Sequence, residues 1–186
     1  MSQGLTKEQK RGCLNGCMGL IIILILGSIL ITSCFNRDEE NKAFDFTVDE
    51  YESTLKTIID KNKGNSFIEM KGKKLVDGKY HINTMDAITV VIEVNKADKV
   101  TAVYGVAKTN AFLAYNKELQ ITYKAIIASV DNTLGLVQQF SIMDNLDMTW
   151  DSKMLDKNNV YTFNDVMYGY RGSTKDDSVI LKAEPN

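Results

Sequence analysis

Apolar residues recur at three- and four-residue steps in three segments, and this spacing predicts amphipathic helices. The first segment covers residues 47–62. Thr47 and Glu50 have the spacing of a capping box, which satisfies backbone N–H groups at a helix start. The other two predicted helices cover residues 110–130 and 133–146, and the second is expected to begin after a polar cap.

Segments rich in β-branched residues predict antiparallel strands between and after these helices. The predicted strands lie at residues 67–74, 79–84, 88–94, 100–107, 159–171 and 177–184. The third and fourth form the strongest hairpin, because a polar five-residue link joins them. Alternation predicts that one face of this hairpin pairs Ile88, Val90, Ile92 and Val94 with Val100, Ala102, Tyr104 and Val106.

The order of these elements is α-β-β-β-β-α-α-β-β, which predicts the α+β class. We expect an antiparallel sheet of about five or six strands with three helices packed on one face. The chain has 186 residues. It divides into an apolar leader at 1–33, a polar tether at 34–45 and a single α+β domain at 46–186, long enough to bury its own core.

The leader contains an uncharged apolar run of fifteen residues, from Met18 to Thr32. A run of this length fits the core of a signal peptide. The wider uncharged stretch of 25 residues, 12–36, is also long enough for a transmembrane helix. Cations precede the run, at Lys7, Lys10 and Arg11, and the residues after it are net negative. The positive-inside rule therefore predicts that the domain lies outside the cytoplasm.

The end of the run reads Ile31-Thr32-Ser33-Cys34, which resembles the lipobox of bacterial lipoproteins. The resemblance implies that signal peptidase II recognises Ile31, Thr32 and Ser33, and that the Cys34 thiol carries a diacylglycerol. Palmitate-like acyl chains would then hold the chain in the bilayer. In a Gram-negative cell, Phe35 after the cysteine implies the outer membrane, facing the periplasm. The alternative is an uncleaved, single-pass membrane helix.

Charge and cysteine content narrow the possible functions. The net charge is −2; the leader carries +2, so the remaining chain carries −4. A mildly acidic domain does not have the basic face of a nucleic-acid binder. The domain has no cysteine, and Cys13 with Cys17 supplies too few ligands for a zinc site. We therefore expect no metal, no other cofactor and no nucleic-acid partner.

Three groups of polar residues are candidate sites. His81, the only histidine, has no nucleophile or metal-ligand pattern around it and is expected to lie on a strand surface. Acidic residues surround Trp150 and predict either a cation site or a solvated loop: Asp144, Asp147, Asp151 and Asp156. Lysines cluster in the first strands and predict either lipid-headgroup contacts or protection of a sheet edge: Lys71, Lys73, Lys74 and Lys79.

The C-terminal strands are rich in aromatic residues. Tyr161 and Phe163 are expected to face the helices, and Tyr168 and Tyr170 the opposite side. Together with Arg171, these last two tyrosines form a possible partner surface, since tyrosine and arginine are frequent in interface hot spots. Packing between neighbouring strands is the simpler interpretation.

The opening residues Phe44, Phe46, Thr47 and Tyr51, followed by this order of elements, resemble small uncharacterised membrane-anchored domains of Gram-negative bacteria. That resemblance implies no activity. Because no catalytic constellation is visible, the sequence predicts a non-enzymatic envelope lipoprotein that binds or assembles with another envelope protein. The alternatives are a single-pass membrane protein with an extracytoplasmic domain, and an envelope enzyme or small-ligand binder.

Overall fold

A computed structural model describes residues 42–186 of the chain. The helical elements are α2 (Val48–Asn62), α3 (Thr109–Ala114), α4 (Asn116–Val130), α5 (Leu136–Asn145) and the 3-10 helix η1 (Ser152–Asp156). The strands are β1 (Lys74–Val76), β2 (Lys79–Met85), β3 (Ile88–Val94), β4 (Val100–Ala107), β5 (Asn158–Phe163), β6 (Val166–Ser173) and β7 (Ser178–Pro185).

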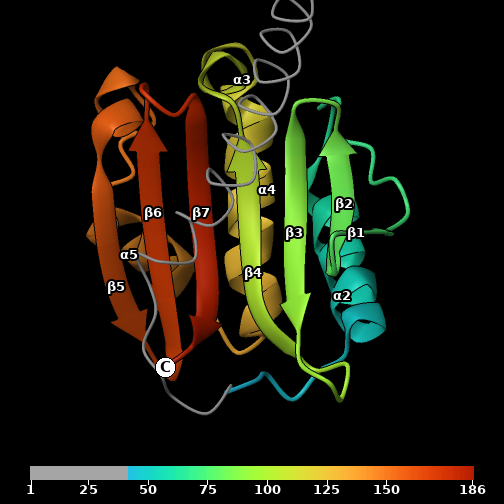
Figure 1. The fold of residues 1–186 in the computed structure, drawn as a ribbon. Coiled ribbons are helices and arrows are strands. Elements are labelled where there is room, and N and C mark those ends of the chain that lie inside the picture. The colour runs from blue at the N-terminus through green and yellow to red at the C-terminus, as the bar shows by residue number, and fades with distance from the viewer. Residues whose placement is uncertain (1–41) are drawn as a thin grey trace, which may run out of the picture. The chain divides into compact units, whose positions relative to one another are not determined.

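The strands form one seven-stranded sheet in the order β1-β2-β3-β4-β7-β6-β5. Every neighbouring pair is antiparallel. Figure 1 shows α2, α4 and α5 behind this sheet, on the same face. The structure therefore confirms the α+β class, while the sheet has more strands than predicted.

The extra strand comes from a turn that the sequence analysis missed. The predicted strand 159–171 is two strands, β5 and β6, which reverse direction at Asn164 and Asp165. Asn164 has a positive φ of 50°, a conformation that asparagine adopts more easily than most residues. The predicted helix 110–130 is also divided, because Tyr115 leaves the helical conformation between α3 and α4.

The β3–β4 hairpin forms as predicted, with a different register. The pairing shifts between Glu93 and Val94, so Ile92 lies opposite Val103 and Val90 opposite Gly105. This bulge moves Ala102, Tyr104 and Val106 to the face away from Ile88, Val90 and Ile92. The predicted pairing of those two sets is therefore wrong.

The predicted strand 67–74 is mostly irregular, and only its last residue belongs to β1. The preceding backbone still follows β2, since the Glu69 N–H donates to Thr84 O at 2.9 Å. At Lys73 the backbone N–H donates instead to Glu52 Oε1 of α2, at 3.3 Å. At Lys73, a hydrogen bond to a helix side chain thus replaces the backbone hydrogen bond to a neighbouring strand that a β-strand would make.

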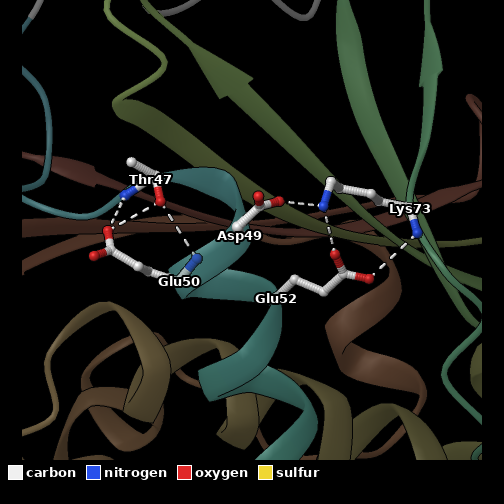
Figure 2. Close-up of polar contacts among 5 residues, drawn as sticks. All are labelled: Thr47, Asp49, Glu50, Glu52 and Lys73. Atoms are coloured by element: carbon white, nitrogen blue, oxygen red, sulfur yellow. Dashed lines mark hydrogen bonds and ion pairs between the residues drawn. The ribbon is translucent and has the colours of Figure 1, made fainter.

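The start of α2 has the predicted capping box, which Figure 2 shows. In the capping box, the Thr47 N–H donates to Glu50 Oε2 at 2.7 Å and the Glu50 N–H donates to Thr47 Oγ1 at 3.4 Å. The Thr47 N–H and the Thr47 hydroxyl both donate to the Glu50 carboxylate, and these two bonds lower the pKa of Glu50. Phe46 also stacks on Tyr51, with ring centroids 5.7 Å apart, as in a hydrophobic staple.

The core lies between the sheet and α4, which also packs against α2 and α5. Gly105 of β4 makes this contact close, because a Cβ there would lie 2.7 Å from both Ile126 and Tyr123 of α4. Phe44 belongs to the same core and is buried, although the sequence analysis placed it in the tether. The Phe44 N–H donates to Val100 O at 2.8 Å, so the chain joins the domain beside the start of β4.

Gly172 of β6 provides a test of this packing. A Cβ at Gly172 would lie 2.0 Å from the Met154 carbonyl oxygen of η1, so neither backbone can accept it without moving. We expect Gly172→Ala to lower the free energy of unfolding by about 3 kcal/mol. Urea unfolding followed by the fluorescence of Trp150, the sole tryptophan, measures it.

Gly72→Ala is the matched control, because a Cβ at Gly72 meets no atom within 4 Å. Its free energy of unfolding should change by less than about 0.5 kcal/mol. Equal effects of the two substitutions would contradict the close contact between β6 and η1.

Candidate functional site

The described helices leave one face of the sheet uncovered, and we call it the open face (Figure 1). Directly paired residues in neighbouring strands point to the same side of a sheet. A single row of such pairs crosses all seven strands of the open face: Lys74, His81, Val91, Tyr104, Lys182, Gly169 and Val160. The opposite side chains, such as Leu181 and Ala183, are buried against the helices.

The centre of the open face is a charged network around the Tyr104 ring. Lys182 Nζ lies 5.7 Å and Lys79 Nζ 6.0 Å from the ring centroid. Lys79 Nζ is 2.5 Å from Glu93 Oε1, and the Tyr104 hydroxyl donates to Glu93 Oε2 at 3.2 Å. Lys182 Nζ also lies 2.5 Å from Glu184. The network therefore alternates positive and negative groups around one aromatic ring.

Lys182 and Tyr104 are held in this network by burial as well as by charge. Only 7% of Lys182 is exposed, and a lysine so deeply placed needs nearby carboxylates to offset the loss of hydration. Burial and the Glu93 and Glu184 charges raise the pKa of Tyr104, so its hydroxyl stays protonated and donates. The network is thus a rigid polar surface.

A small cavity of about 200 Å³ lies beside the network, at the β1–β2 side of the sheet. Its walls are formed by Lys71, Gly72, Lys74, Val76, His81 and Asn83. Burial lowers the pKa of His81, and the nearby charge of Lys79 lowers it further. This volume is below the 300–1,000 Å³ typical of small-molecule sites. Its basic lining suits an acidic group of a larger partner.

His81 and the acidic residues do not form a metal centre within residues 42–186, where no group of three potential ligands converges. Asp147 pairs with Lys157. Asp151 accepts from the Lys153 N–H at 2.8 Å. Asp156 accepts from the Thr174 hydroxyl at 2.7 Å. Asp147, Asp151 and Asp156 therefore contact different parts of the local fold and do not converge on one point.

The predicted lysine cluster is dispersed by ion pairs. Lys71 Nζ lies 2.7 Å from Asp86, and Lys79 pairs with Glu93. Figure 2 shows Lys73 between two carboxylates of α2: its Nζ donates to Glu52 Oε2 at 2.9 Å and also pairs with Asp49. Lys73 thus connects the segment before β1 to α2.

The predicted partner surface at Tyr168 and Tyr170 is wrong, because both side chains are 0% exposed and face the helices. The missed turn at 164–165 is the reason. In one continuous strand Tyr161 and Tyr168 would lie on opposite faces, but the turn places them opposite each other on the same face. Arg171 does lie on the open face, where it pairs with Asp176 at 2.5 Å.

The residues that the sequence analysis did not select are Glu93, Tyr104 and Lys182. Their signal was a charged residue inside an apolar strand, as in the Val-Ile-Leu-Lys-Ala segment of β7. A charge in such a position marks the side of the strand that faces away from the core. The sequence predicts that the strands of Glu93 and Tyr104 are neighbours, but it does not show that β7, with Lys182, lies beside β4.

Comparison of the chain with protein-family models, curated proteins and solved structures found no match. Within residues 42–186, no helix is both long enough and apolar enough to cross a bilayer. The predicted lipobox, Ile31 to Cys34, lies outside the described residues. Interpretation of the site therefore depends on the geometry of the open face and on the sequence of the leader.

The two buried tyrosines give a paired test of the β6 environment. The Tyr170 hydroxyl donates to Met154 O at 2.9 Å, whereas the buried Tyr168 hydroxyl has no partner among the described residues. We expect Tyr170→Phe to lower the free energy of unfolding by about 1 kcal/mol, since it leaves a buried carbonyl unpaired. Tyr168→Phe should be neutral or stabilising, because it removes an unsatisfied hydroxyl.

Urea unfolding of both variants checks this difference. Both substitutions keep the aromatic ring, so packing is conserved and the hydrogen bond is the variable. A cost for Tyr168→Phe equal to that for Tyr170→Phe would contradict the assigned hydroxyl partners.

Proposed function

We propose that this chain is a membrane-anchored, non-enzymatic binding or assembly module on the extracytoplasmic side, with Cys34 as its lipid attachment point. The leader supports the anchor: cations precede an apolar run that ends in a lipobox-like sequence. We assign the binding role to the open face, because the described helices cover only the other side of the sheet and leave this side accessible.

The open face suits a protein partner better than a small ligand. The network around Tyr104 spans four strands and alternates in charge, and its ion pairs already fix the Lys79 and Glu93 side chains. A partner with the complementary charge order would meet groups that need little further ordering. The adjoining cavity could receive one acidic side chain from that partner, between Lys71 and Lys74.

Lipid attachment at Cys34 would keep this surface near the bilayer. Phe44 lies in the core, and its N–H donates to Val100 O at the start of β4. Nine residues separate Cys34 from Phe44, and a fully extended segment of that length spans about 30 Å. A lipid on Cys34 would thus hold the domain close to the membrane, and its partner would be another envelope protein.

Metabolic labelling with a palmitate analogue tests the anchor. We expect label on the full chain and none on Cys34→Ala, because the thiol is the lipid acceptor. Cys17→Ala is the matched control and should keep the label, since it alters a cysteine before the apolar run. Equal labelling of Cys34→Ala and the unchanged chain would contradict the lipoprotein assignment.

The mass of the mature N-terminus separates the two forms of anchor. A lipoprotein begins at Cys34 and carries acyl chains, whereas a single-pass membrane protein keeps residues 1–33. A retained leader without lipid would show that the chain is a single-pass membrane protein rather than a lipoprotein. The proposed binding role would be unchanged.

Photo-crosslinking in cells tests the open face as the binding surface. A photoreactive phenylalanine at Val91, in the centre of the face, should capture one partner, whereas the same group at exposed Lys61 of α2 should not. Exchanging the pair as Lys79→Glu with Glu93→Lys keeps an ion pair but reverses its direction. This exchange should reduce capture at least tenfold, with an unchanged circular dichroism spectrum.

Capture that survives the charge exchange, or that is equal at both positions, would contradict a charge-complementary partner on the open face.

A further inference from the structure

The two edges of the sheet differ in how they are protected against pairing. β1 is only three residues long and contains Lys74. β5, at the opposite edge, has six residues, Asn158–Phe163, with no charge and no proline. It pairs with β6 in continuous register without a bulge. Short length, lysine, proline and bulges are the usual means by which edge strands avoid pairing, and β5 has none of them.

The outer backbone of β5 is also open within residues 42–186. Phe163 and Val166 flank a two-residue turn, so the backbone groups of Phe163 and Tyr161 bond to β6. The N–H and C=O groups of Asn158, Val160 and Thr162 therefore point away from the sheet. No described loop or side chain hydrogen-bonds to those groups. Figure 1 shows β5 as the outermost strand on its side.

The side chains of β5 would gain contacts from an added strand. Val160, on the open face, is 51% exposed. On the helix side, the rings of Tyr161 and Phe163 are half-buried, with centroids 6.4 Å apart. β-branched and aromatic residues are the types that gain most from cross-strand packing.

We propose that β5 pairs antiparallel with β5 of a second copy of this chain, so that one sheet runs through both copies. The inference goes beyond the proposed function and does not depend on the lipid anchor. A second copy fits because an uncharged strand brings no like charges opposite each other. With the two-fold axis at Tyr161, Val160 lies opposite Thr162 of the second copy.

The same register matches the outward backbone groups of the two strands. Val160 and Thr162 both direct their N–H and C=O groups away from β6, so placing them opposite each other gives a hydrogen-bonded pair. The two-fold axis repeats this pair on the other side of Tyr161. The edge of β5 is thus self-complementary in its backbone groups as well as uncharged.

The two-fold axis of such a pair is perpendicular to the sheet, so the two Phe44 attachment points lie on opposite sides of the axis. Both can face one bilayer when the sheet lies parallel to the membrane. The pairing is therefore compatible with an anchor on each copy, and it leaves the open face available when the helices face the bilayer.

The test uses the full chain in its membrane, with p-benzoylphenylalanine incorporated at Thr162. Because Thr162 faces Val160 of the second copy, illumination should give a product of twice the chain mass. The control position is Leu75 of β1, which is 64% exposed and should give no such product. Crosslinking of Thr162 to a different protein, or equal products at both positions, would overturn the proposal.

Substitutions then test the backbone pairing in detergent-solubilised full chain by sedimentation. Val160→Pro removes an outward N–H without removing a bond to β6, and should raise the dimer dissociation constant at least tenfold. Leu75→Pro removes the equivalent outward N–H of β1 and should leave the dimer dissociation constant unchanged. Thr162→Lys leaves the backbone hydrogen bonds of β5 intact and adds a charge to the edge, so it should also weaken the dimer. It therefore tests the pairing even if the proline variant fails to fold.

A monomeric unchanged chain, or a dimer that resists both β5 substitutions, would overturn the pairing. Loss of lipid label in the Cys34 experiment would leave these results unaffected, so the two proposals fail separately.

Discussion

The close approach of α4 to the middle of the sheet is the contact on which the rest of the fold depends. It requires Gly105, because any larger residue would collide with Tyr123 and Ile126. With α4 seated there, α2 and α5 pack on its two sides and complete a helical layer over one face. The helices of this layer pack on the apolar side of the central strands. The opposite side of these strands therefore carries polar and half-buried residues.

The polar side is not simply solvent-exposed surface. Lys182 is nearly as buried as the core, yet it lies on the open face, which the helices of residues 42–186 do not cover. Its position is stable because the Tyr104 ring and the Glu184 carboxylate replace lost hydration. An ordered arrangement of charges on a flat face is a good surface for recognition, since little conformational entropy is lost when a partner binds.

Local signals in the sequence predicted local structure well. The capping box at Thr47 and the β3–β4 hairpin both form, because each is determined by residues close together in the chain. The register bulge at Glu93 and the turn at Asn164 were missed, and each error moved side chains to the wrong face. The open-face network could not be predicted from the sequence. It depends on the pairing of β7 with β4, whose residues are far apart along the chain.

The position of β7 has a consequence for how the protein is made. Strand β7, the last of the described strands, lies between β4 and β6, and within the sheet it alone joins the half-sheet β1–β4 to the hairpin β5–β6. During synthesis the facing edges of the two halves therefore stay unpaired until β7 has been made. A chain without β7 would have two half-sheets with no ladder between them rather than a slightly smaller sheet, so the strand made last is the one that completes the sheet.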